Sequence, residues 1–262
     1  MNWTKYQDIG IEAALKAGRM LRENMSSHRE ISYKGVVDLV TNFDSRSQDI
    51  ILNHLSSFFP DHDFLAEEDP SERRRSEFRW IIDPIDGTTN FAHSFPVFCI
   101  SIALEYQDNI AAGIVYDPMR DEIFSAVEGD GAHLNGSRIM VSRIDDLDKS
   151  LLATGFPYDL RKSRMNNIDH FINFIKQAQA VRRCGSAALD ICYVACGRFD
   201  GFWEIKLKPW DVAAAALILS EAGGRVSDFH GNPLNIFGIE TLGSNGLIHK
   251  QMVEVLQSIK KV

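Results

Sequence analysis

Apolar and polar positions alternate along the first half of the chain in a way that predicts two helices and a set of strands. Residues 3–25 and 43–59 place apolar side chains three or four positions apart, the spacing of an amphipathic helix, and Pro60 ends the second one. Short apolar runs and turn sequences such as Asn135-Gly136 predict strands up to about residue 145. The strand candidates are 64–66, 78–82, 97–104, 111–116, 122–127 and 138–142. We therefore expect two helices packed on an antiparallel sheet.

The second half shows a different pattern, in which short apolar strands alternate with helical segments. The strand candidates are 151–154, 200–204, 225–227 and 240–243, and the helix candidates are 161–178, 186–197, 211–222 and 246–260. Gly223-Gly224 is a typical helix stop, and the alternation favours an α/β arrangement. The change of pattern predicts two regions, residues 1–147 and 148–262. Because no linker rich in proline or glycine separates them, we expect the two regions to share an interface.

Composition and charge narrow the class of partner. The chain has 262 residues, of which 45% are apolar and 24% charged, as in a soluble globular protein. It carries 28 Lys and Arg against 36 Asp and Glu, a net charge of −8. Direct nucleic-acid binding is not expected, because phosphate contacts require a basic face. A small phosphorylated substrate held by a metal remains compatible with this charge.

The chain shows no pattern typical of export or membrane insertion. Residues 1–25 carry charges throughout, unlike a signal peptide, and the longest apolar run, Val212 to Leu219, is far shorter than the roughly 20 residues of a membrane span. The four cysteines form no C-x-x-C pair, and buried thiols explain them best. We therefore expect a cytoplasmic protein without a membrane segment.

Acidic residues directly follow two of the predicted strands. Glu67 and Glu68 follow 64–66, and Asp83 follows 78–82, with Asp86 three residues later. If the two strands are neighbours, these carboxylates lie close together, and such crowding either raises their pKa values or requires a cation between them. The plainer alternative is a set of solvated loop acids.

The sequence after Asp83 weighs against that alternative. Pro84 restricts the spacing between Asp83 and Asp86, Gly87 permits close backbone approach, and the next residues resemble a helix start with N–H groups that can bind phosphate. All candidate ligands are oxygens, which favours Mg²⁺ or Mn²⁺ over Zn²⁺. No histidine pair stands at metal-ligand spacing, and His93 is best interpreted as structural.

A further aspartate stands at the start of a predicted helix. Asp211 follows Pro209-Trp210 and precedes an alanine-rich run, which places it in the first helical turn. From spacing alone, a simple helix cap and a site residue are equally good interpretations.

Several segments together resemble a known family. Residues 80–91, Trp-Ile-Ile-Asp-Pro-Ile-Asp-Gly-Thr-Thr-Asn-Phe, resemble the first signature of the inositol monophosphatase family, and Trp210 to Ala214 resembles its second. Further matching segments are Asp38 to Thr41 with Asp44, Glu67-Glu68, and Gly185 to Ala188. The resemblance covers about residues 34 to 225 in the family's order. It implies a layered αβαβα sandwich of mixed α+β and α/β character, a homodimer, and a Mg²⁺-dependent phosphatase that lithium inhibits.

The same resemblance implies a metal and catalytic set. Glu67, Asp83 and the carbonyl of Ile85 match the ligands of a first metal, and Asp83, Asp86 and Asp211 match those of a second. Two or three Mg²⁺ ions per subunit are implied, with Mn²⁺ as a possible substitute. The catalytic residues that match are Glu67, Thr88, Asp44 and Asp86, of which Asp44 and Thr88 orient and activate a water with Glu67.

On the substrate side, the resemblance implies a phosphate cradle and a polyol site. The backbone amides of Gly87 and Thr88 match the cradle, while the backbone of Ala187 and the side chains of Glu204 and Asp211 match groups that hold hydroxyls. Inositol monophosphate is the leading substrate. Related enzymes act on fructose-1,6-bisphosphate, histidinol phosphate, nucleotide 3′-phosphates or NADP, and Glu204 favours a polyol because it would repel a second phosphate.

A different class of function is that of a non-catalytic regulator docked on transcription or RNA machinery. The intact carboxylate set favours an enzyme, because crowded acids that serve no purpose only destabilise a fold.

Overall fold

The computed structural model describes residues 1–27, 31–33, 39–70 and 75–258. Its helices are α1 (Trp3–Glu23), α2 (Asn42–Phe58), α3 (Thr88–Ala92), α4 (Ile168–Ile175), α5 (Ala187–Ala195), α6 (Pro209–Glu221) and α7 (His249–Gln257), with one 3₁₀ turn at Leu147–Lys149. The strands β1 (Ile31–Tyr33) and β2 (Leu39–Thr41) form a small antiparallel pair. Asp38, which the family resemblance includes, lies outside the described residues.

A seven-stranded sheet forms the centre of the first half. Its strands follow one another in chain order: β3 (Asp63–Ala66), β4 (Phe78–Asp86), β5 (Cys99–Tyr106), β6 (Asn109–Asp117), β7 (Glu122–Val127), β8 (Gly131–Leu134) and β9 (Ser137–Arg138). All neighbours are antiparallel except β3 and β4, which run parallel. This one parallel pair brings the ends of β3 and β4 to the same edge of the sheet.

A five-stranded mixed sheet forms the centre of the second half. Its order is β11 (Ala180–Arg182), β10 (Leu151–Thr154), β12 (Gly201–Ile205), β14 (Glu240–Ser244) and β13 (Arg225–Ser227). Strand β10 is parallel to both of its neighbours, whereas β14 is antiparallel to both of its own.

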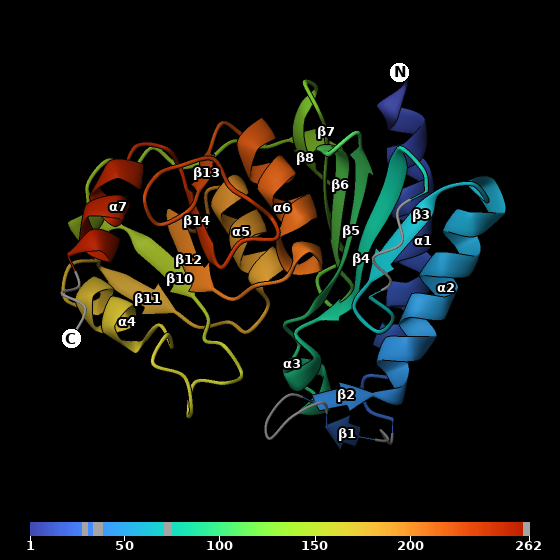
Figure 1. Cartoon of the computed structure of the whole chain (residues 1–262), viewed down its shortest axis with the longest axis horizontal. Coiled ribbons are helices and arrows are strands. Elements are labelled where there is room, and N and C mark those ends of the chain that lie inside the picture. The colour runs from blue at the N-terminus through green and yellow to red at the C-terminus, as the bar shows by residue number, and fades with distance from the viewer. Residues whose placement is uncertain (28–30, 34–38, 71–74, 259–262) are drawn as a thin grey trace.

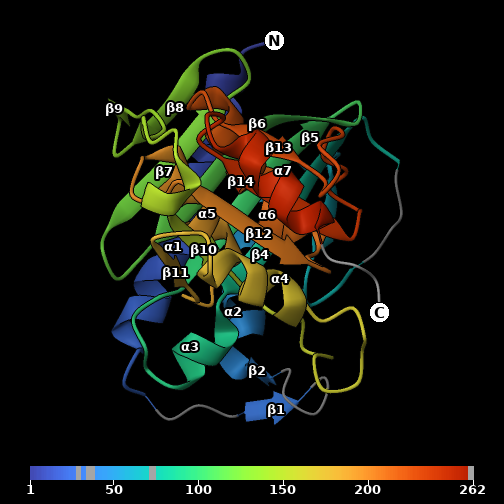
Figure 2. The same ribbon diagram turned by 90° about the vertical axis from the view of Figure 1, so that its left-hand side faces the viewer.

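The helices and sheets stack in five layers, which Figure 1 shows from the side. Helices α1 and α2 pack on the outer face of the seven-stranded sheet, α5 and α6 lie between the two sheets, and α4 and α7 cover the far face of the five-stranded sheet (Figures 1 and 2). Small residues allow the central contact, since a Cβ atom on Gly113 of β6 would lie 2.7 Å from the carbonyl oxygen of Ala214 on α6. The fold is thus the αβαβα sandwich that the resemblance implies.

Most predicted elements are confirmed, but two are wrong in extent. The strand expected at 138–142 is limited to β9, because the backbone N–H of Val141 donates to Ala222 after α6 instead of to a neighbouring strand. The helix expected at 161–178 is limited to α4, which begins after Asn167, a residue with a left-handed backbone (φ 70°). The sequence patterns do not predict strands β1, β2, β8 and β11.

The chain passes from the first sheet to the second between Arg138 and Leu151. Both sheets contribute side chains to the apolar cluster around α5 and α6, so the two halves share a core, as expected. The boundary at residues 147 and 148 as a division into domains stays a prediction.

Candidate active site and metal centre

The ends of β3 and β4 bring acidic side chains together at one edge of the first sheet. Ala66 pairs with Ile82, so the next residues along the two strands, Glu67 and Asp83, are neighbours. The backbone N–H of Glu67 donates to the Ile82 carbonyl at 3.2 Å. The two strands that precede the acids are thus adjacent, and the carboxylates are not dispersed on solvated loops.

Three aspartates from two distant segments meet at this edge. Asp83, Asp86 and Asp211 each offer a carboxylate oxygen, and these three atoms lie within 4.8 Å of one another, the one such acidic group in the described part of the chain. Asp83 and Asp86 are buried, with 1% and 8% of their surface exposed. Burial, followed by the charge of the neighbouring Glu67, raises the pKa of Asp83.

The turn between Asp83 and Asp86 is held by local hydrogen bonds. The register of β4 against β5 shifts between these residues, and the Ile85 N–H donates to Asp83 Oδ1 at 2.9 Å. Gly87 follows with a left-handed backbone (φ 100°), and a Cβ atom there would lie 3.1 Å from the carbonyl oxygens of Val97 and Gly185. Both the conformation and the close packing favour glycine at this position.

Asp86 is anchored by the beginning of α5. Its Oδ2 accepts hydrogen bonds from the Ser186 hydroxyl at 2.7 Å and the Ala188 N–H at 2.8 Å. The positive end of the helix dipole also favours a carboxylate here. Because these bonds use Oδ2, the other oxygen of Asp86 stays available as a ligand.

Asp211 is both a helix cap and a member of the cluster. It is the third residue of α6, after Pro209, and its Oδ2 accepts the backbone N–H of Lys208 at 2.7 Å. The helix cap is therefore confirmed and Asp211 also lies in the cluster, while its role as a site residue stays a prediction.

A second hydrogen-bonded pair lies next to the cluster. The Thr88 hydroxyl is 2.9 Å from both Asp44 Oδ1 and the Ile85 carbonyl oxygen. Asp44 Oδ2 accepts the backbone N–H and the hydroxyl of Thr41, which completes a capping box at the start of α2. Burial is the main reason why the pKa of Asp44 is raised to about 6.

Burial and mutual repulsion make this centre unfavourable without a counter-charge. Burial, followed by the charges of Glu67, Asp86 and Asp211, raises the pKa of Asp83 well above its usual value. Burial and then Asp86 raise the pKa of Asp211 to about 8. Crowded oxygen ligands with raised pKa values are the environment that a hard divalent cation such as Mg²⁺ relieves, so the residues present fit such an ion.

A cavity of about 1100 Å³ opens over the centre, between residues of the two halves. Its walls include the acids Glu67, Asp83, Asp86, Glu204 and Asp211, the turn residues Ile85, Gly87 and Thr88, and the segments 156–159, 205–210 and 237–239. Glu204 on β12 is buried, and burial followed by the charge of Asp211 raises its pKa well above the usual value. The space is large enough for a small organic phosphate with its leaving group.

Two predicted residues do not line the cavity. Asp44 lies behind Thr88, to which it is hydrogen-bonded. Ala187 is buried at the first position of α5, one residue before the N–H that holds Asp86.

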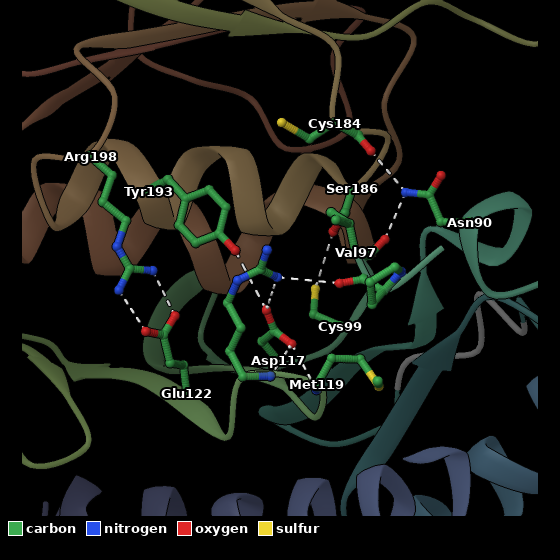
Figure 3. Close-up of polar contacts among 12 residues, drawn as sticks. Asn90, Val97, Cys99, Asp117, Met119, Glu122, Cys184, Ser186, Tyr193 and Arg198 are labelled. Atoms are coloured by element: carbon green, nitrogen blue, oxygen red, sulfur yellow. Dashed lines mark hydrogen bonds and ion pairs between the residues drawn. The ribbon is translucent and has the colours of Figure 1, made fainter. Parts of the chain in front are cut away.

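Sequence reasoning missed the side chain that joins α3 to the loop before α5. Figure 3 shows the Asn90 amide reaching the carbonyl oxygens of Val97 and Cys184, at 2.7 and 2.8 Å. It thereby connects the Gly87 turn to the segment that carries Ser186. Asn90 stands in the quoted signature, but periodicity and charge give no signal for such a role.

The sequence also predicts buried thiols and no membrane segment. Cys99 and Cys192 are buried, Cys184 and Cys196 are partly buried, and all four thiols are free. Within the described ranges, no helix has the length and hydropathy needed to cross a bilayer.

Comparisons with known proteins agree with the geometry. The model of the "Inositol monophosphatase family" matches residues 2–261. The chain is 45% identical over 251 residues to an inositol-1-monophosphatase of Synechocystis, covering 95% of this chain and 88% of that protein. It is 43% identical over 227 residues to the Nus factor SuhB of Escherichia coli (strain K12), covering 86% and 85%.

Among solved structures, an inositol monophosphatase from Anabaena superimposes with a TM-score of 0.91 at 40% identity. The match covers 100% of this chain and 99% of that one. With the fold, the acidic centre and the whole-length match in agreement, the chain belongs to the inositol monophosphatase family.

Proposed function

We propose that this member of a phosphatase family hydrolyses the phosphate monoester of a small polyol, with inositol 1-phosphate as the leading substrate. The observation that carries the proposal is the convergence of Asp83, Asp86 and Asp211 beneath a cavity, next to the Gly87 turn. A phosphate monoester is doubly negative, so a site made of carboxylates can take it only with cations between them.

Asp83, Asp86 and Asp211 would hold the divalent cation, with Glu67 and the Ile85 carbonyl as further ligands. The all-oxygen donor set favours Mg²⁺, two or three ions per subunit, with Mn²⁺ as a substitute. When bound, the cation neutralises phosphate charge and lowers the pKa of a water molecule.

Asp44 and Thr88 would orient the attacking water together with Glu67. Because the Thr88 hydroxyl can donate to Asp44 Oδ1, its own lone pairs can accept a hydrogen bond from water. With a pKa of about 6, Asp44 is mostly ionised near neutral pH and can take up the proton released by that water.

The backbone N–H groups of Gly87 and Thr88 would contact the phosphate oxygens. On the leaving-group side, Glu204 and Asp211 would accept hydrogen bonds from polyol hydroxyls, with the backbone of Ala187 as a further contact. The buried carboxyl of Glu204 supports a polyol as the leaving group, since its oxygens can form hydrogen bonds with hydroxyls.

A panel of phosphate esters tests the substrate. Phosphate release is measured from inositol 1-phosphate, fructose-1,6-bisphosphate, histidinol phosphate, adenosine 3′,5′-bisphosphate and NADP, each with and without Mg²⁺. We expect the highest kcat/KM with inositol 1-phosphate and none without the metal. A clearly higher kcat/KM with any other ester in the panel would contradict the assignment of a polyol phosphate as the substrate.

A regulatory role is the second candidate, favoured by the 43% identity to a protein named a Nus factor. Expression of the Asp83→Asn variant in a strain lacking the gene separates the two. Rescue of the deletion phenotype supports regulation without catalysis, whereas failure of a folded variant supports the enzyme. A homodimer, a cytoplasmic location and inhibition by lithium remain predictions.

A further inference from the structure

Lys206 has an unusual backbone conformation at the wall of the cavity. It follows β12 directly, two residues after Glu204, and its φ is 64°, in the left-handed region that favours glycine. Its backbone N–H donates to the Ile239 carbonyl at 2.6 Å, which fixes this conformation. Strain of this kind persists only where surrounding contacts compensate for it.

The compensating contacts come from the side chain. The Lys206 ammonium lies 2.9 and 2.7 Å from the two carboxylate oxygens of Asp159 and 2.8 Å from the Ser163 hydroxyl. Asp159 and Ser163 both belong to residues 155–167, which we name the mouth loop. A lysine at this position, whose backbone conformation favours glycine, therefore makes three polar contacts to one loop.

The base of the mouth loop is held independently by buried groups. The Asn167 amide donates to the Gly155 carbonyl at 2.6 Å and the Thr154 hydroxyl at 2.9 Å, and its oxygen accepts the indole N–H of Trp203. The two ends of the loop are thus joined to each other and to β12. Lys206 adds a separate attachment within the loop, at Asp159 and Ser163.

The part of the loop between these two attachments forms a wall of the cavity. Phe156, Pro157, Tyr158 and Asp159 line it together with Glu204 and Asp211, the two residues proposed to contact the leaving group. At the start of the loop, a Cβ atom on Gly155 would lie within 2.3 Å of the Glu204 carboxylate, so loop and carboxylate are in direct contact. A shift of the loop therefore changes the environment of Glu204 directly, without involving the turn that carries Asp83 and Asp86.

We propose that Lys206 is a positioning residue that holds the mouth loop against the cavity and thereby sets the affinity for the leaving group. The kinetic part of this inference rests on the proposed phosphatase function, whereas the attachment of the loop does not. The ion pair is partly exposed, with 27% of the Lys206 and 50% of the Asp159 side chain accessible. Exposed pairs contribute little to global stability, so the effect is expected in the loop rather than in the whole fold.

The loop provides its own probe, because Arg161, Lys162 and Arg164 are exposed on it and are trypsin sites. The test compares the wild type with Lys206→Met, which removes the charge, Lys206→Gly, which also relaxes the backbone, and Lys206→Arg, which keeps the charge. Lys149→Met is the matched control, since Lys149 forms a similar surface pair with Asp146 and does not line the cavity. Cleavage after the three loop residues is followed by fragment mass, next to kcat and KM for inositol 1-phosphate.

For Lys206→Met and Lys206→Gly we expect loop cleavage and KM to increase about three- to five-fold, the equivalent of one exposed ion pair, with kcat nearly unchanged. Lys206→Arg and Lys149→Met should behave as the wild type. Wild-type cleavage rates and KM in both Lys206→Met and Lys206→Gly would overturn the inference. If the wild type itself releases no phosphate, the proposed function fails, and the cleavage rates still decide whether Lys206 holds the loop.

Discussion

The Thr88 hydroxyl connects two parts of the proposed catalytic site. It lies between Asp44, in the first turn of α2, and the Ile85 carbonyl in the turn between Asp83 and Asp86. One hydroxyl thereby connects the candidate base to a candidate metal ligand. A change of this single oxygen atom should affect catalysis far more than stability.

We expect Thr88→Val to lower kcat about 100-fold or more, because it removes the hydroxyl that orients water, whereas Thr88→Ser keeps most activity.

In the wild type, kcat/KM should fall as pH falls through about 6, where Asp44 becomes protonated. Phosphate release between pH 5 and 8 measures both effects. Equal activity of the valine and serine variants would remove Thr88 from the mechanism.

The sequence indicates single candidate residues where their chemistry is unusual for their position. Asp83 stands out because it directly follows an apolar strand, with Asp86 three residues later, whereas for Asp211 the spacing leaves a helix cap equally good. Lys206 and Asn90 do not stand out, since their roles depend on partners 47 and 95 residues away in the chain. Only the folded chain reveals such partners.

At the scale of elements, α5 acts as a support for the metal turn. The hydroxyl of Ser186 and the N–H of Ala188 hold one oxygen of Asp86, so the position of the helix determines where the other oxygen lies. Residues that hold metal ligands in place typically contribute 10- to 100-fold to metal affinity.

Ser186→Ala should therefore raise the Mg²⁺ concentration required for half-maximal activity by roughly 10-fold, with a smaller change in kcat at saturating metal. Ser150→Ala is the matched control, because this buried hydroxyl donates to the Leu147 carbonyl outside the site. Titration of activity with Mg²⁺ gives both values. The same Mg²⁺ requirement in both variants would show that Ser186 does not support the metal turn.

The elements themselves were predicted where apolar periodicity is continuous, as for α1, α2 and β10. The prediction failed at 138–142 and 161–178, where apolar residues alternate with turns. At 138–142 the backbone N–H of Val141 donates to the carbonyl of Ala222, after α6. At 161–178 the side chain of Asn167 accepts the indole N–H of Trp203. In both segments, partners distant in the sequence override the local pattern. Local pattern contains no information on such partners.

At the scale of the whole molecule, the acidic centre makes stability depend on pH and metal. Without metal, the pKa of Asp211 is about 8 in the folded chain against a usual value of 3.8, so the folded state binds more protons than the unfolded state between these values. The stability of the metal-free protein should therefore rise as pH falls from 8. Below about 6.5 His249, whose pKa burial lowers to about 4, acts in the opposite direction.

We accordingly expect the Tm in EDTA to increase from pH 8 to pH 6.5, and Mg²⁺ to remove this slope by stabilising the ionised carboxylates. The Asp211→Asn variant should show a smaller slope in EDTA, because Asp83 and Glu204, whose pKa values burial also raises, remain. Thermal unfolding in the two buffers provides the measurement. A Tm that does not change with pH in EDTA would contradict the repulsion inferred between the buried carboxylates. An equal pH dependence of the Tm in Asp211→Asn would contradict it as well.

The arrangement of the whole molecule was not available from pattern alone. Periodicity predicts elements, but it cannot say that α5 and α6 lie between two sheets or that β3 runs parallel to β4. The five-layer order came from the family resemblance. The meeting of Asp211 with Asp83, which are 128 positions apart, follows from that order and not from spacing.

The most direct test of the account measures Mg²⁺ binding and phosphate release from inositol 1-phosphate side by side, in the wild type and in Asp83→Asn. We expect the wild type to bind Mg²⁺ and to lose activity in EDTA, and the folded variant to bind the ion weakly and to lose activity by orders of magnitude. Wild-type turnover in Asp83→Asn, or undiminished turnover of the wild type in EDTA, would contradict the central claim that these aspartates hold the catalytic cation.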